Sequence, residues 1–68
     1  MVNTKKLVGL IAEHGYTREQ IAEKLGISDP TFRRRLRTGI FDSDEMYKLV
    51  KILEIDDPAP IFFADDGA

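Results

Sequence analysis

Apolar residues recur at helical spacing from the start of the chain. Between positions 7 and 11 this spacing predicts a helix that begins at Asn3 or Thr4 and extends to His14. Gly15 follows directly, where a helix commonly ends in a left-handed backbone conformation that glycine adopts without steric cost. The chain therefore begins with a helix whose apolar side needs other segments to pack against.

Two further helices are predicted on either side of a tight turn. Thr17 and Gln20 have the spacing of a capping box, in which each side chain accepts a hydrogen bond from the other residue's backbone N–H. Gly26 ends that second helix at a sharp reversal, and Ser28 then caps a third helix that Gly39 ends. The side chains expected to face inward are Ile21, Ala22 and Leu25 of the second helix and Phe32 and Leu36 of the third.

The remaining part of the chain predicts a fourth helix and a short fifth one. Asp42 or Ser43 caps the fourth helix, and Pro58 begins one or two further helical turns. No segment alternates apolar and polar residues as a strand does, so the protein is predicted to be all-α, a compact bundle of four to five short helices. Residues 1–64 are expected to form a single domain, and residues 65–68 a frayed tail. The expected apolar stripe of the fourth helix is Met46, Leu49, Val50 and Leu53.

Composition excludes several kinds of site. The 68 residues include no cysteine and a single histidine, His14, so a disulfide framework, a thiolate metal site and a histidine cluster are all unavailable. We therefore expect no metal and no cofactor. Apolar runs are too short to span a membrane, and the first residues lack the cleavage site of a signal peptide. These features predict a soluble, cytoplasmic protein.

Charge is distributed unevenly, although the formal total is only −2. Residues 17–37 carry six basic and three acidic side chains, whereas residues 42–68 carry two basic and eight acidic ones. Four arginines fall within positions 33–37. A basic segment followed by an acidic one is typical of some nucleic-acid-binding proteins, and the simpler interpretation is a solvated helix face paired with the acidic tail.

The segment TREQIAEKLGISDPTFRRRLRTG, residues 17–39, combines several features around the predicted turn: Ala22 where two helices touch, Gly26 in the turn, Ile27 after it, Ser28 as a cap and Phe32 facing inward. With these features it resembles the phage Cro and repressor-like helix-turn-helix family, also called XRE-like. The following GIFDSDEMYKLVKIL is similar to a phage-repressor subgroup. The resemblance implies a lambda-repressor-like DNA-binding domain and a transcriptional regulator, a phage or prophage repressor or Cro-like protein. It further implies a location in a bacterial host cell, on the nucleoid when DNA is bound.

A projecting helix over residues 28–37 fits the major groove of double-stranded DNA, which is about 12 Å wide. Arginine commonly reads guanine there through two hydrogen bonds. Asp29 can accept from cytosine N4 or simply stabilise the helix N-terminus, and Arg35 stays ambiguous because the rotation of this helix is open. The residues predicted to read bases are Asp29, Pro30, Arg33 and Arg34, with Arg33 first.

Other residues are predicted to contact phosphate, which fixes the position of the protein on DNA without reading sequence. Helix N-termini favour anions, and Arg37 lies near the end of the third helix. The expected phosphate contacts are Thr17, Arg18, Ser28, Arg37 and Thr38.

One recognition helix covers few base pairs, so we expect a weak homodimer on a pseudo-palindromic operator. Phe62 and Phe63 are adjacent, so one can cover the core while the other meets a partner. The expected interface residues are Tyr47, Ile55, Ile61, Phe62 and Phe63.

The alternative from another functional class is a protein-interaction module, an antirepressor or adaptor, that uses its acidic C-terminal half on the same fold. An enzyme is not expected. No nucleophile has a recognisable base, and so small a domain has little room for the pocket that a small-molecule substrate would need.

Overall fold

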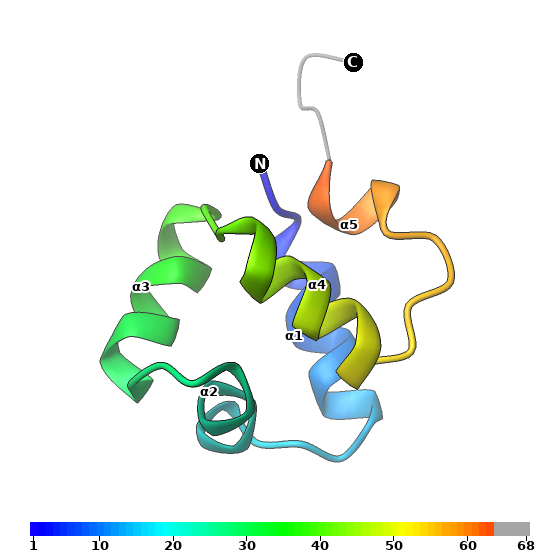
Figure 1. The fold of residues 1–68 in the computed structure, drawn as a ribbon. Helices are drawn as coiled ribbons and strands as arrows, with labels where there is room; N and C mark the ends of the chain where they lie inside the picture. Colours follow the sequence, from blue (N-terminus) through cyan, green and yellow to red (C-terminus); the bar gives the residue numbers. More distant parts are fainter. Residues whose placement is uncertain (64–68) are drawn as a thin grey trace.

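The computed structural model describes residues 1–63, which form five helices and no strand (Figure 1). This confirms the all-α prediction. The predicted end of the domain at residue 64 and the predicted tail at 65–68 lie outside the described residues. The helices are α1 (Thr4–Glu13), α2 (Arg18–Leu25), α3 (Asp29–Thr38), α4 (Ser43–Ile52) and α5 (Ala59–Phe62).

Each of the first four helices begins at a side chain that accepts a hydrogen bond from its first turn. Asn3 caps α1, and Thr17 with Gln20 forms the predicted capping box of α2, with hydrogen bonds of 3.1 and 2.8 Å. For α4 the cap is Asp42 rather than Ser43, and Glu45 completes a second capping box. These local bonds satisfy N–H groups that a helix leaves unpaired at its start, which is why the helix starts could be predicted.

The helices enclose one core of buried apolar side chains. Phe32 of α3 is fully buried and meets the edge of the Phe41 ring, with ring centres 6.2 Å apart. The predicted inner residues of α2 are all buried, whereas Leu36, Met46 and Val50 are half-buried against the core. The core consists of Val2, Leu7, Ile11, Ile21, Ala22, Leu25, Phe32, Phe41, Leu49, Leu53, Ile61 and Phe62.

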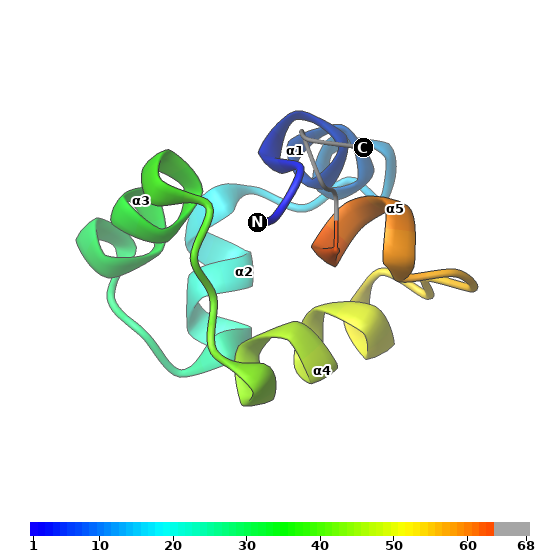
Figure 2. The same cartoon turned by 90° about the horizontal axis from the view of Figure 1, so that it is seen from above.

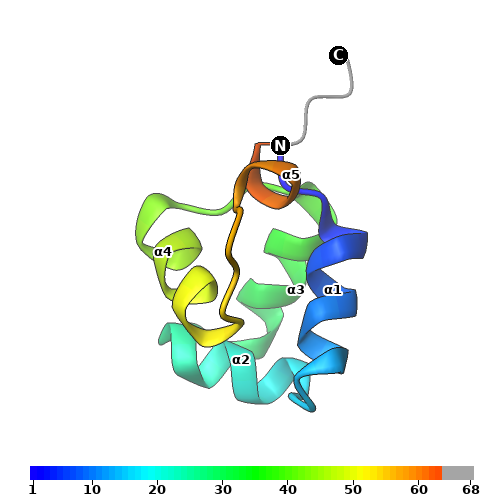
Figure 3. The same ribbon diagram turned by 90° about the vertical axis from the view of Figure 1, so that its right-hand side faces the viewer.

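The arrangement of the helices leaves α3 at one side of the molecule. α2 packs against both α3 and α4, and α1 packs against α5. In two perpendicular views α3 lies at the edge opposite α5 (Figures 1 and 2). The N-terminal segment connects the end of α3 with α5. The Val2 N–H donates to the carbonyl of Gly39, which follows α3, and the Asn3 N–H donates to the carbonyl of Ile61 in α5. Seen from the α5 side, α3 lies behind, between α4 and α1 (Figure 3).

Candidate nucleic-acid interface

The turn between α2 and α3 reverses the chain within three residues. Gly26 has a φ of +75°, and no atom lies within 4 Å of where a Cβ would be, so glycine is favoured here by backbone conformation and not by lack of space. The N–H groups of Gly26 and Ile27 donate to the carbonyls of Glu23 and Ala22, both at 3.0 Å. These bonds close the end of α2 and direct the chain into α3.

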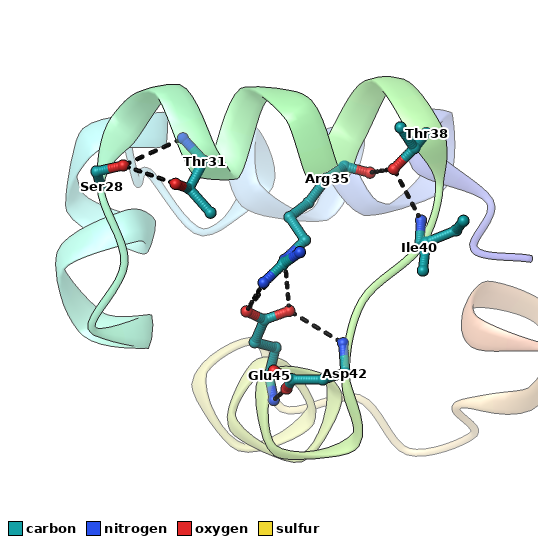
Figure 4. Close-up of polar contacts among 7 residues, drawn as sticks. All are labelled: Ser28, Thr31, Arg35, Thr38, Ile40, Asp42 and Glu45. Carbon is teal, nitrogen blue, oxygen red and sulfur yellow. Dashed lines mark hydrogen bonds and ion pairs between the residues drawn. The ribbon is translucent and has the colours of Figure 1, made fainter.

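The inner side of α3 is fixed by the buried Phe32 and by an ion pair with α4 that the sequence did not predict. Figure 4 shows this ion pair. Arg35 Nε lies 2.9 Å from Glu45 Oε1, and Arg35 Nε and Nη2 donate to Glu45 Oε2 at 3.1 and 3.0 Å. The Glu45 side chain is only 5% exposed. Arg35, ambiguous in the sequence, therefore faces the body of the domain, which fixes the rotation of α3.

Glu45 has two functions in this arrangement. Its Oε1 also accepts from the Asp42 N–H at 3.0 Å, so one carboxylate caps α4 and holds α3 at the same time. A buried carboxylate is tolerated when donors surround it, and loss of one member of such a pair leaves an uncompensated charge. The capping-box spacing of Asp42 and Glu45 was a signal in the sequence for the first function, but nothing local pointed to Arg35 as the partner.

The outer side of α3 presents the other arginines to solvent. Arg33, Arg34 and Arg37 are all exposed, and the exposed fraction of the Arg33 side chain is 64%. Asp29 Oδ2 lies 3.1 Å from Arg33 Nε, one helical turn away, whereas Arg34 and Arg37 form no ion pair with residues 1–63. Pro30 is exposed in the first turn. The four residues predicted to read bases thus lie on the first turns of α3, and two of them contact each other.

The residues predicted to contact phosphate differ in whether their side chains already form hydrogen bonds within the protein. Arg18 begins α2 and is exposed, like Arg37. The Ser28 hydroxyl donates to Thr31 Oγ1 at 2.8 Å, and the Thr38 hydroxyl donates to the Arg35 carbonyl at 3.4 Å (Figure 4). The Thr17 hydroxyl accepts from Gln20 within the capping box. The two arginines are therefore the members of this set with uncommitted charge, and the hydroxyls also organise helix ends.

An apolar groove of about 230 Å³ lies between α4 and α5. Tyr47 and Phe63 line it and are more than half exposed, while Phe62 is buried at its base. Three predicted interface residues are thus brought together. Ile55 and Ile61 instead line a separate shallow cavity, and Ile61 is buried. Two further exposed apolar side chains, Met1 and Ile40, line a neighbouring pocket that shares Met46 and Phe62 with the groove.

None of the helices among residues 1–63 is long and apolar enough to cross a membrane. Those residues also contain no group of three or more histidine, aspartate or glutamate side chains placed to hold a metal ion.

The described chain is thus a five-helix domain in which α2, a three-residue turn and α3 form a helix-turn-helix. A family model described as a homeodomain-like domain matches residues 6–38, which include most of α1 and all of α2 and α3. No curated protein and no solved structure gave a match. The family match supports a helix-turn-helix domain and suggests DNA binding, without favouring the phage Cro and repressor-like family over others.

Proposed function

We propose that this protein binds double-stranded DNA sequence-specifically as a transcriptional regulator, with α3 lying in the major groove. The observation that carries the proposal is the two-sided arrangement of α3. Its inner side is held by the buried Phe32 and by the pair of Arg35 with Glu45, while Arg33, Arg34 and Arg37 face outward. A rigidly held helix with outward arginines meets the geometric requirement for reading base edges.

The outward residues are proposed to contact two different parts of DNA, the base edges and the phosphate backbone. Arg33 and Arg34, in the middle of α3, are proposed to reach base edges, with Asp29 and Pro30 beside them. Arg37 at the helix end and Arg18 at the start of α2 are proposed to contact phosphates, together with Thr17, Ser28 and Thr38. Phosphate contacts would supply most of the affinity and base contacts the preference for sequence.

A regulator of this kind would act as a weak homodimer on a pseudo-palindromic operator. The groove beside Tyr47 and Phe63 supports this part of the proposal, because it exposes aromatic surface that a second copy could cover. By the resemblance of residues 17–39, we further propose a repressor or Cro-like regulator of a phage or prophage, acting in the cytoplasm of a bacterial host.

Selection of bound sites from random duplex DNA tests the proposal. The wild-type protein should enrich a two-fold related sequence, and Arg33→Ala should relax preference at one base pair per half-site. Arg37→Ala should weaken all sites by about the same factor. The reverse pattern would mean that the roles of the two arginines are exchanged.

The same groove and the acidic C-terminal half also fit the second candidate, a protein-interaction module. Salt dependence separates the two candidates, since a protein that neutralises several phosphates binds mixed-sequence DNA much more weakly as salt is added. Absence of binding to any duplex at low salt would favour the interaction module.

A further inference from the structure

One outward arginine of α3 differs from the other two before any DNA is present. Arg33 Nε lies 3.1 Å from Asp29 Oδ2, whereas Arg34 and Arg37 have no carboxylate within ion-pair distance among residues 1–63. Asp29 Oδ1 is buried and has no hydrogen-bond partner in this part of the chain. One oxygen of the Asp29 carboxylate is thus buried, and the other lies against Arg33, with the Asp29 side chain 29% exposed.

This contact leaves the two terminal amino groups of Arg33 free to bind a base. A guanidinium has five N–H donors, and the Nε of Arg33 faces Asp29 while the two terminal amino groups remain for another acceptor. Those two groups are the ones that can meet O6 and N7 of guanine together. Holding a long side chain in one orientation in advance also reduces the entropy lost when it binds.

The negative charge of Asp29 also affects the affinity for the DNA backbone, which it lowers. A carboxylate on a surface that faces phosphates repels them, so Asp29 lowers the affinity of this face for DNA of any sequence. Asp29 would thus act on both affinities that define specificity. It lowers the affinity for DNA of any sequence, and it strengthens the contact of one base-reading side chain with its own site.

We propose that Asp29 is a positioning residue that sets sequence specificity by orienting Arg33 toward a guanine, without itself contacting a base. The proposal rests on the DNA-binding function above. It deepens that function by naming the base read and the residue that enforces the reading. It also gives Asp29 a role beyond stabilisation of the α3 N-terminus.

Asp29→Asn tests the proposal because it removes the charge and keeps the size of the side chain. Binding is measured by fluorescence anisotropy on the selected duplex, on duplexes with one substituted base pair each, and on a mixed-sequence duplex. The preference for guanine at the position that Arg33→Ala identifies should fall about twofold, as fits the loss of an exposed ion pair between residues four apart on a helix. Preferences at other positions should be unchanged, and affinity for the mixed-sequence duplex should be no weaker than in the wild type.

Asp44→Asn is the matched control. Asp44 lies in the first turn of α4 and pairs with Lys48 at 3.1 Å with the same spacing of four residues. The substitution removes the same charge from the first turn of another helix, where the carboxylate forms the same kind of ion pair without touching α3's arginines. It should leave every base preference unchanged. In addition, Asp29→Asn combined with Arg33→Ala should lose no more selectivity than Arg33→Ala alone.

The outcomes separate this inference from the function on which it rests. Retained guanine preference in Asp29→Asn, or an equal loss of affinity on all duplexes, would overturn the role of Asp29 while DNA binding stands. A wild-type preference that does not depend on Arg33 would overturn it as well. Failure of the wild-type protein to bind any duplex at low salt would overturn the proposed function itself.

Discussion

The inner and outer sides of α3 carry the same kind of side chain in opposite surroundings. Arg34 and Arg35 are neighbours in sequence, yet Arg34 is exposed while Arg35 reaches the buried carboxylate of Glu45. The difference comes from α4, whose first turn lies next to the inner side of α3 (Figure 4). A run of arginines is therefore not a uniform basic patch, because one of the four fixes the orientation of the other three.

This comparison separates stability from binding. The outward arginines make few contacts within the described chain, so the folded state loses little when one of them is removed. The inward arginine is half-buried and pairs with the buried carboxylate of Glu45, so the folded state depends on it. Substitutions on the two sides should have effects that differ both in size and in the property that they change.

The largest effect is expected from Glu45→Ala. Removal of this buried carboxylate takes away the hydrogen-bond acceptor of the half-buried Arg35 guanidinium and also removes half of the α4 capping box. The free energy of unfolding should fall by about 2 to 4 kcal/mol, from the lost charged hydrogen bonds together with the lost cap, measured by urea denaturation followed by circular dichroism. For a domain of this size such a loss can abolish folding at ordinary temperature.

Two controls keep that result interpretable. Asp44→Ala removes an exposed acid from the same first turn of α4 and should change stability by no more than about 0.5 kcal/mol. The double substitution of Arg35→Met with Glu45→Leu replaces the pair with apolar groups and should cost less than Glu45→Ala alone. A Glu45→Ala protein as stable as the wild type would contradict the structural role assigned to this pair.

The second effect concerns the angle at which α3 is held. Ala22 of α2 is 2% exposed, in the helix that packs against both α3 and α4. Ala22→Leu adds volume to a site with no room for it and should lower stability by about 1 to 3 kcal/mol. By enlarging a buried side chain of the helix that packs on α3, it should also weaken binding to the selected duplex more than Ala12→Leu, a control at an exposed position of α1. Equal affinities of the two variants would contradict a fixed angle between these helices.

The helix ends show which parts of the fold were predictable from sequence. Thr17, Gln20 and Gly26 act on their own helix over three or four residues, so their spacing alone predicted where α2 begins and ends. The pair Phe62 and Phe63 was also interpretable, because adjacent positions on a helix point in different directions. Phe62 is 3% exposed and Phe63 67%, as expected for one core residue and one surface residue.

The partner of Arg35 was not predictable in the same way. Arg35 and Glu45 are ten residues apart and lie on different helices, so their contact depends on how α4 packs beside α3. Helical spacing puts Arg35, three residues after Phe32, on the inner side of α3, but no local preference identifies Glu45 as its partner. The same reason explains Ile55 and Ile61, whose apolar character fitted an interface but which line a cavity away from the groove.

The third prediction uses Arg37 to sharpen the contrast with Arg35. Arg37→Ala should change stability by no more than about 0.5 kcal/mol, since Arg37 is exposed. The slope of log affinity against log salt concentration should decrease in magnitude by about 0.9, the value for one lost phosphate contact. Anisotropy titrations at four salt concentrations measure this slope. Lys51→Ala on α4 is the control and should leave the slope unchanged, so equal changes in the two variants would place Arg37 away from DNA.

An equally small effect on stability is expected at the groove between α4 and α5. Phe63→Ser should change the free energy of unfolding by no more than about 0.5 kcal/mol, because the side chain is already 67% exposed. If a second copy covers the groove, this variant should sediment as a monomer at concentrations where the wild type associates. Its affinity for a single half-site should be unchanged, and its binding to two half-sites should become independent. Retained cooperativity in Phe63→Ser would exclude this groove as the dimer interface while leaving the role of α3 unaffected.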